Sequence, residues 1–331
     1  TSNGLLAETQ YPNNKIPAIV NPVATYLFAH AELLPVPNRP ANAGTVSTND
    51  YQNAVTNNYL NNQGDGRLDY TLSSHDTSMA KGSYGDAYDY PSNAVIPVQF
   101  PLKHDYPFAM GVVDWIHTFS PSLVNELRGG YSRVVEDTET SDPSGVFGTH
   151  GDQLLGIGYP GTQPLAGFTN MYIQGSDAGS FGTDISAGTK TIDNNFAYED
   201  GITWVHGNHI TRAGAQFVRY QENYVSPSNL GGLNGYISYF ADYTANYNCY
   251  GVGGVCSNGD GLADFELNKA EVALVSQATG PFGARQWREA YYVQDDWKVL
   301  PSVTLNLGLR YAYDQPMYEA HDKMSTINLP K

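Results

Sequence analysis

The residues best suited to chemistry in this sequence are histidines and polar oxygens that lie close together along the chain. His206 and His209 flank a Gly-Asn pair, a spacing that places both beside a tight turn, and no third metal ligand lies near them in the sequence. Asn258, Asp260 and Asp264 offer oxygen ligands, but an EF-hand loop needs alternating ligands, a central glycine and a closing glutamate. We interpret the histidine pair as part of a hairpin turn and expect no metal site.

The common catalytic motifs are absent from the sequence. It contains no G-x-S-x-G elbow, no H-E-x-x-H pair and no phosphate-binding glycine loop that ends in Lys-Ser or Lys-Thr. The neighbouring carboxylates Asp295 and Asp296 fall on opposite faces of a strand, so they cannot share a substrate. The sequence therefore predicts a protein that is not an enzyme and that needs no cofactor.

The elements that carry these residues are strands, and the clearest pattern lies in residues 303–313. Apolar Val, Leu and Tyr side chains alternate there with Thr, Asn, Gly, Arg and Ala, which is the period of a strand with one apolar and one polar face. Residues 287–298 are strand-like in their aromatic content, and the connection 299–302 contains Pro and Ser in positions that suit a tight turn. The stretch predicts a β-hairpin.

The length of this hairpin and the position of its aromatic residues suggest a membrane strand. A strand tilted through a bilayer needs about 9–11 residues, whereas a soluble strand usually has about 5–6. The expected lipid-facing residues end in aromatics, as in the girdles that bracket a lipid-facing band; they are Leu305, Leu307, Leu309, Tyr311, Tyr313 and, beside the turn, Trp297. An amphipathic strand of a soluble β-sandwich fits the same pattern, and the hairpin alone leaves both interpretations open.

Residues 291–311, YYVQDDWKVLPSVTLNLGLRY, resemble the signature hairpin of TonB-dependent outer-membrane receptors, most of all the large Oar-like receptors abundant in Acidobacteria. Further segments resemble that subfamily in the same order; they are IPAIVNPVA at 16–24, PVPN at 35–38, TFSPSLVNELRGGY at 118–131, WVHGNHITRAGAQF at 204–217 and GLADFEL at 261–267. The resemblance spans nearly the whole chain, and QDDW at 294–297 is its most specific part.

The resemblance implies an all-β fold, an antiparallel transmembrane β-barrel portion of about 8–10 strands with short inner turns and long outer loops. A whole receptor of this family closes about 22 strands around a plug. We expect an irregular outer loop at 1–63, strands and loops at 64–313, and the start of another outer loop at 314–331. The sequence shows no plug and no signal peptide, so we expect an internal portion of a longer receptor.

Other segments repeat the hairpin pattern less clearly. We expect hairpins within 67–84, 106–135 and 191–224, short helices at 22–33 and 262–267, two further strands at 236–243 and 271–277, and a long outer loop at 136–190. With 41% hydrophobic residues, the chain has no run near the ~18 apolar residues that a transmembrane helix requires.

The acidic composition limits the partners. A formal net charge of −16 argues against nucleic acid or an anionic lipid surface as a partner, because both demand basic patches. As a hypothesis, acidic outer loops bind the divalent cations that crosslink lipopolysaccharide, or favour cationic substrates; simple solubility is the plain alternative. The two cysteines, Cys249 and Cys256, are joined by a short glycine-rich connection that can bring them within bonding range, so we expect a disulfide in an exported protein.

By resemblance, the parent protein is an energised importer in the outer membrane of a Gram-negative bacterium. It would contact outer-membrane lipid and lipopolysaccharide, and the TonB complex would act through the plug that this sequence lacks. The substrate, a small molecule or an oligomer such as a carbohydrate, peptide or metal chelate, stays unidentified. Six polar residues are candidates to face the lumen and contact the substrate. The alternative is that they only hydrate the barrel interior or form salt bridges there. They are Arg67, Asp69, Glu126, Arg128, Asn306 and Arg310.

Two alternatives come from other classes of protein. A structural or adhesive surface protein would pair the exposed edges of its sheet with other copies of itself. A soluble β-sandwich that binds carbohydrate through its many tyrosines would pack its apolar faces against each other. In the first alternative self-association replaces transport.

Overall fold

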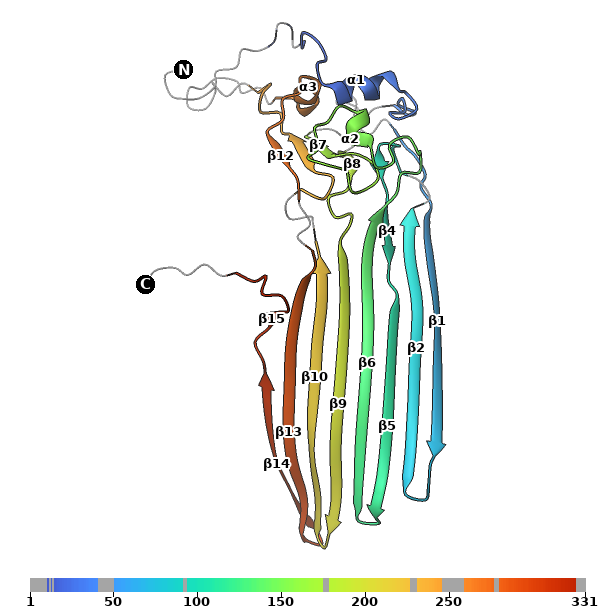
Figure 1. The fold of residues 1–331 in the computed structure, drawn as a ribbon, viewed down its shortest axis with the longest axis vertical. Helices are drawn as coiled ribbons and strands as arrows, with labels where there is room; N and C mark the ends of the chain where they lie inside the picture. The colour runs from blue at the N-terminus through green and yellow to red at the C-terminus, as the bar shows by residue number, and fades with distance from the viewer. Residues whose placement is uncertain are drawn as a thin grey trace, which may run out of the picture.

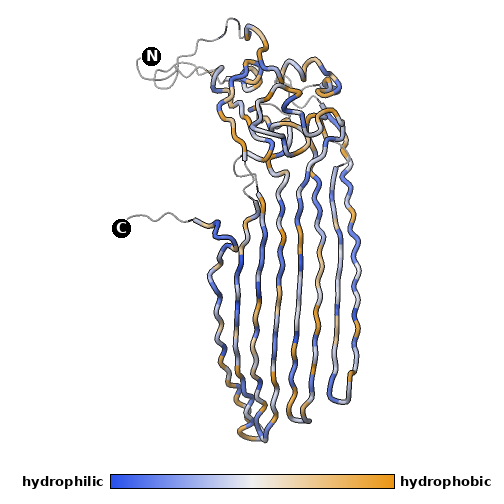
Figure 2. Tube along the Cα trace, viewed as in Figure 1, coloured by the Kyte–Doolittle hydropathy of each residue, from blue (hydrophilic) through white to orange (hydrophobic). Residues whose placement is uncertain are grey.

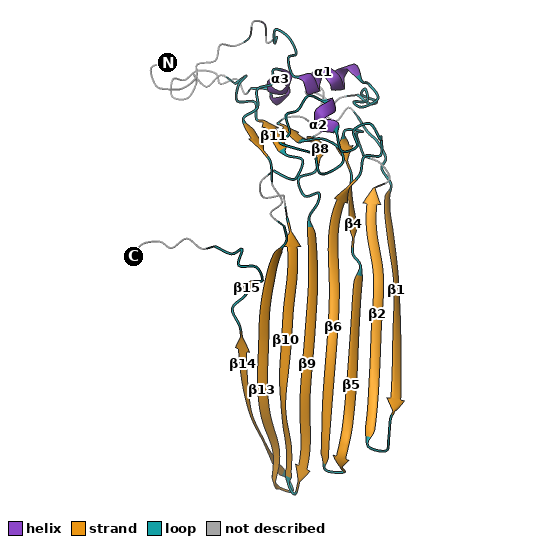
Figure 3. Cartoon of the chain, in the orientation of Figure 1, coloured by secondary structure: helices purple, strands orange, loops and turns teal. Residues whose placement is uncertain are grey.

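The computed structural model describes residues 11, 13, 15–40, 51–91, 94–174, 179–226, 231–245, 259–276 and 280–325. Long antiparallel strands form one extended sheet, which we call the wall (Figure 1). A smaller sheet and three short helices gather at one end of it, and we call this part the cap (Figure 3). Among the described residues, no helix is long and apolar enough to cross a membrane.

The wall contains ten strands that pair antiparallel with their neighbours. They are β1 (Asn57–Thr71), β2 (Asp76–Pro91), β4 (Leu102–Asp105), β5 (Phe108–Ser120), β6 (Leu123–Thr140), β9 (Lys190–His206), β10 (His209–Val225), β13 (Phe282–Leu300), β14 (Val303–Asp314) and β15 (Tyr318–Glu319). Short turns join the hairpins at the end away from the cap, while the connections at the cap end are long (Figure 1). This arrangement confirms the predicted antiparallel fold class.

β4 and β5 act as one interrupted strand. Both pair with β2 on one side and with β6 on the other. The interruption falls at Tyr106 and Pro107, and proline has no N–H to donate to a neighbouring strand. The wall therefore keeps a continuous surface from β2 to β6.

The register of the pairs assigns every side chain of the wall to one of two faces, because residues directly opposite in an antiparallel ladder point the same way. Leu309 pairs with Val293, and Ala213 pairs with both Val293 and Ile202. We call the face that these four residues share the apolar face and the other one the polar face. Figure 2 shows hydrophobic residues interspersed among hydrophilic ones along the strands of the wall.

The cap is built from the long connections between wall strands. Its elements are α1 (Pro22–Ala29), α2 (Gly151–Leu154), α3 (Gly261–Glu266), β3 (Gln99–Phe100), β7 (Asn170–Ile173), β8 (Ser180–Thr183), β11 (Tyr236–Tyr239) and β12 (Val272–Leu274). Asn21 caps α1 by accepting from the Val23 N–H, and Pro22 follows at the first helical position, where its missing N–H costs nothing. Asp260 caps α3 in the same way.

The hydrophobic core of the described residues lies in the cap. It contains Val23, Ala24, Leu27, Leu33, Val98, Phe100, Phe147, Leu155, Phe168, Met171, Ile173, Phe181, Tyr239 and Phe265. The rings of Phe100 and Phe168 meet edge to face, with centroids 5.4 Å apart. Buried Asn21 joins α1 to α3 by donating to the Phe265 carbonyl over 2.7 Å. The cap is thus packed as a water-soluble domain is.

Several local predictions agree with the structure, and one is wrong. The hairpins expected within 67–84, 106–135 and 191–224 are present, as are helices near 22–33 and 262–267. Residues 136–190 do not form a plain loop, because they contain the end of β6, α2, β7 and β8. Phe147 and Phe168 in this segment are fully buried, which ties it into the core of the cap.

Candidate functional site: the polar face and the cap

The six residues considered as lumen-facing candidates share the polar face of the wall. Asn306 pairs with Asp296, and Arg310 pairs with Tyr292, which itself lies opposite Gly214. The paired residues of the other strands extend this assignment from β10 through β9 and β6 to β5, β2 and β1. The polar-face candidates are Arg67, Asp69, Glu126, Arg128, Asn306 and Arg310.

Charged side chains form a network across the middle of the polar face. The Arg128 guanidinium donates to Asp114 Oδ2 from Nε over 2.9 Å and from Nη2 over 2.8 Å. Its Nη2 also donates to Glu126 over 2.5 Å, and its Nη1 lies 3.7 Å from Glu199. Asp114 is only 6% exposed, so Arg128 neutralises a carboxylate that water hardly reaches.

The network continues towards β14 through a glutamine. Gln216 donates to Glu199 over 2.9 Å and accepts from Arg310 over 3.4 Å. β13 lies between β10 and β14, and its residue opposite Gln216 is the small Ala290, which also lies opposite Ala312. Polar groups thus form a connected row from β5 to β14. Sequence reasoning missed Asp114, Glu199 and Gln216, although the alternation in 108–120 already placed Asp114 opposite its apolar neighbours.

Tyr292 shows how tightly the polar face packs beside this row. A Cβ atom on Gly214 would lie 2.6 Å from the Asp200 carbonyl oxygen and 2.8 Å from the Tyr292 ring. Glycine at this position therefore leaves room for the Tyr292 ring and hydroxyl beside the neighbouring strand.

The opposite face carries the residues expected to contact lipid. Leu307, Leu309 and Tyr311 are 57%, 73% and 60% exposed, which soluble strands avoid over so long a stretch. The apolar-face candidates are Leu305, Leu307, Leu309, Tyr311, Tyr313 and Trp297, and the register places all six on this face. Several carboxylates also lie on this face, and three of them have hydrogen-bond donors from side chains of the same face: Asp200 from Asn125, Glu289 from Tyr291, and Asp295 from Thr211.

Histidine and tryptophan rings gather on the apolar face near the short turns. His117 lies 5.5 Å from Trp115, His206 lies 5.1 Å from Trp204, and His209 lies 5.3 Å from Trp297 between ring centroids. Amphipathic rings of this kind are typical of the boundary between lipid and water. The two histidines at 206 and 209 thus lie beside a turn, as expected.

The adjacent carboxylates Asp295 and Asp296 serve different partners. His209 Nδ1 lies 2.6 Å from Asp295 on the apolar face, whereas Arg212 donates to Asp296 over 2.5 Å on the polar face. Within the described part of the chain, no group of three or more His, Cys, Asp or Glu side chains is placed to hold a metal ion. The expected disulfide between Cys249 and Cys256 lies outside the described residues.

Two carboxylates are buried in the cap. Asp264 is fully buried; its Oδ2 accepts from the Tyr243 N–H over 3.0 Å, and its Oδ1 has no hydrogen-bond partner among the described residues. Burial raises the pKa of Asp264 to about 6, and the neighbouring Glu271 carboxylate adds to the rise. Burial also raises the pKa of Asp152, although its carboxylate accepts from the Thr169 N–H. The cap therefore holds groups that titrate above their ordinary range.

Long antiparallel strands with one apolar and one polar face, short turns at one end and folded connections at the other define the wall of a membrane-spanning β-barrel. The chain belongs to the outer membrane beta barrel domain family, whose model matches residues 1–331. It is accordingly a protein of the outer membrane.

Comparison with individual proteins adds one structural likeness. The chain is similar to the outer membrane transporter YddB from Escherichia coli, with a TM-score of 0.43 and 10% sequence identity. The match covers 80% of this chain and 29% of that chain, so it spans less than a third of the transporter's length. No curated protein matches the sequence.

Proposed function

We propose that this chain forms part of the wall and the outer loops of a TonB-dependent receptor, an energised importer. In this proposal the apolar face contacts lipid and the polar face lines the lumen. The cap lies on the outer side of the membrane, because long connections face outward in outer-membrane barrels and short turns face inward. A catalytic role has no part in this proposal.

The observation that carries the proposal is the row of charged and amide groups on the polar face, on strands whose other face exposes Leu307, Leu309 and Tyr311. In a receptor barrel such a row faces either the plug or the substrate on its way through the lumen. The hairpin at 291–311, which resembles the receptor signature, supplies one end of this row through Arg310. Asp114 and Arg128 supply the other end.

The wall has two edges that need partners. Among the described residues, β1 pairs only with β2, and β14 pairs only with β13. Backbone N–H and C=O groups left unpaired in hydrocarbon cost several kcal/mol each. We propose that further strands of a longer receptor pair with both edges and close the barrel.

An uptake experiment tests the transport proposal. Cells carrying the intact gene and cells lacking it receive a ferric hydroxamate chelate, a mixture of malto-oligosaccharides or a tryptic peptide mixture, each labelled. We expect uptake of one probe that requires both the gene and the TonB complex, and that stops when a protonophore collapses the proton gradient. Equal uptake with and without the TonB complex, or no gene-dependent uptake of any probe, contradicts energised import.

The open edges also favour a second candidate, a structural or adhesive surface protein whose copies pair edge to edge. The two proposals differ in the mass of the native particle. Native mass spectrometry of protein extracted from outer membranes of the source organism separates them. A single chain whose mass is well above 36.1 kDa supports the receptor. A series of particles whose masses are multiples of 36.1 kDa supports self-assembly.

A further inference from the structure

Two adjoining cavities lie on the apolar face of the wall, and general contact with lipid does not account for their shape or their charged lining. They lie where β1, β2, β5, β6 and β9 run side by side, one nearer the cap and the other near the middle of these strands. One is polar and the other is lined mainly by glycines and apolar side chains. The register places them directly one above the other.

The polar cavity, of about 590 Å³, lies nearer the cap. Three cations converge on it: Lys103, Arg133 and Lys190. Lys103 is 2.8 Å from Asp105, and Lys190 is paired with Asp137. Arg133 donates instead to the amide oxygen of Asn194 over 2.9 Å, and among the described residues it forms no ion pair with a carboxylate. No carboxylate of the described residues is therefore paired with this guanidinium, which lines the cavity beside the two paired lysines.

The remaining lining suits a sugar. Asp86, Asp105 and Asp137 offer carboxylate oxygens that accept hydrogen bonds from hydroxyl groups, and Tyr84 and Tyr88 offer rings. Tyr84 is 64% exposed, so its ring is free to pack against a ligand. A phosphate alone would be repelled by three carboxylates, whereas a phosphorylated sugar can use the cations and the carboxylates together.

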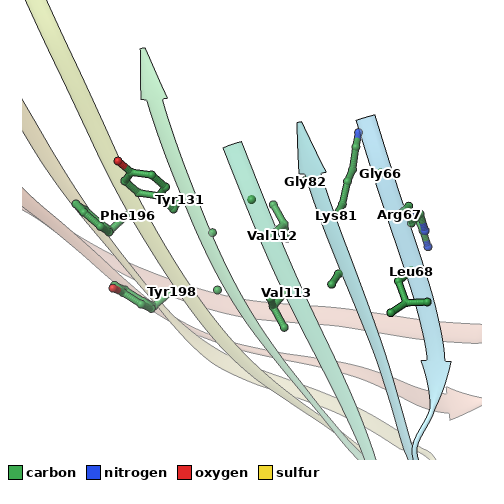
Figure 4. Close-up of a pocket in the computed structure, with 14 residues that line it drawn as sticks. Gly66, Arg67, Leu68, Lys81, Gly82, Val112, Val113, Tyr131, Phe196 and Tyr198 are labelled. Carbon is green, nitrogen blue, oxygen red and sulfur yellow. The ribbon is translucent and has the colours of Figure 1, made fainter. Parts of the chain in front are cut away.

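The apolar cavity, of about 790 Å³, begins one row below (Figure 4). Gly82 lies opposite both Gly66 and Gly111, and Gly111 lies opposite Tyr131. The row above runs through Tyr84, Ala109 and Arg133, and the row below contains Leu68, Ala80, Val113 and Gly129. One row along a strand is a rise of ~6.6 Å, so the polar cavity continues directly into this groove.

No part of the described chain explains the glycines in this groove. A Cβ atom on Gly66 or Gly129 would meet nothing within 4 Å, and on Gly82 or Gly111 it would meet only a carbonyl oxygen at 3.9 Å. A β-carbon would therefore fit at each of these positions without a close contact. The absence of side chains at these positions leaves an apolar channel beside the rings of Tyr131, Phe196 and Tyr198 (Figure 4).

We propose that this surface binds one molecule of the phosphorylated glycolipid of the outer leaflet, the lipid A part of lipopolysaccharide. Its phosphorylated sugar occupies the polar cavity with a phosphate on Arg133, and an acyl chain lies in the glycine groove. The order of the two cavities matches the order of headgroup and chain in the leaflet next to the cap. The inference rests on the assignment of the apolar face to lipid, and transport is not required for it.

The test uses protein extracted in mild detergent from outer membranes, with retained lipopolysaccharide measured per chain by native mass spectrometry. Arg133→Ala removes the cation that has no carboxylate partner, and Gly129→Leu adds a side chain to the groove at a position where its Cβ meets nothing within 4 Å. Arg310→Ala on the polar face and Ala215→Leu, on the apolar face away from the groove, are matched controls. Only protein that keeps the gel mobility of the folded barrel before heating is scored, so a folding defect does not count as lost binding.

We expect about one lipopolysaccharide per chain in the wild type and a loss of about tenfold in affinity for Arg133→Ala, as for one charge-assisted contact. Gly129→Leu should lose binding to a similar extent, and both controls should stay within about twofold of the wild type. Retention of glycerophospholipid instead of lipopolysaccharide overturns the proposal. So does equal loss in the Arg133 and Arg310 variants, or retention by both test variants.

Discussion

Replacing Asp264 by Asn should stabilise the cap at neutral pH. Asp264 is fully buried with one carboxylate oxygen unpartnered among the described residues, and its pKa is raised to about 6 from an ordinary 3.8. Holding it ionised at about pH 7.5 costs roughly 3 kcal/mol relative to a solvated carboxylate. Asparagine carries no charge, can still accept from the Tyr243 N–H, and can donate to Glu271. We expect a gain of roughly 1–3 kcal/mol at about pH 7.5 and little gain at about pH 4.

The sign of the pH dependence follows from the direction of the pKa change. Because the folded cap favours the protonated form of Asp264, its stability in the wild type is highest below pH 3.8 and falls between pH 3.8 and about 6. Above that range it stays flat. Hydrogen exchange of the Leu267 and Lys269 amides, which donate to Ala263 and Asp264 in and after α3, measures this stability after correction for intrinsic rates.

Asp142→Asn is the control, because the pKa of Asp142 is lowered whereas that of Asp264 is raised. The Asp142 carboxylate accepts N–H groups of Phe147 and Gly148, and although burial alone would raise its pKa, these hydrogen bonds and those from Ser144 lower it. Asp142→Asn should therefore destabilise the cap at about pH 7.5. Two results would refute the reasoning: wild-type protection that rises from about pH 4 to about pH 7, or faster exchange in the Asp264→Asn variant than in the wild type at about pH 7.5.

Three further predictions concern the wall. Gly214→Ala should destabilise the barrel by about 1–3 kcal/mol because its Cβ meets a backbone oxygen. The Cβ of Gly66→Ala meets nothing, so this variant is the control, and urea unfolding in micelles compares the free energies of unfolding of the two. Glu319 accepts three backbone N–H groups, so Glu319→Ala, which leaves all three without this acceptor, should weaken the contact of β15 with β13 by about 1–3 kcal/mol, read by hydrogen exchange. A spin label at Leu307 should be relaxed by oxygen in the bilayer and one at Asn306 by a water-soluble nickel chelate; the reverse pattern disproves the face assignment.

The wall could be predicted from the sequence because its strands are long and each obeys a period of two. The pattern at 303–313 places Leu307 and Arg310 on opposite faces without any tertiary information, and the register shows the same separation. Short turns such as Gly207 and Asn208 set the register of the hairpins. Neighbouring strands could be paired because each follows the previous one in the chain.

Some short elements of the cap could be predicted, but its packing could not, because its contacts join segments far apart in the sequence. Asn21 reaches Phe265 across 244 positions, and Asn234 donates to the Leu165 carbonyl across 69. The strands there are short, and β7 pairs parallel with β11, so neither length nor alternation marks them. Composition dominated by Gly, Asp and Ser suggested a loop, while the few large residues that form the core were too widely spaced to show a period.

The two parts of the chain are stabilised by different surroundings, which explains why their sequences look so different. The cap buries Phe147, Phe168 and Tyr239 and so carries its own hydrophobic driving force in water. The wall leaves Leu309 73% exposed and Tyr311 60% exposed, so its apolar face gains stability only when lipid covers it. Extraction from the membrane should therefore weaken the wall while the packing of the cap persists. The outer loops can then keep a fixed shape on a wall whose own stability depends on the bilayer.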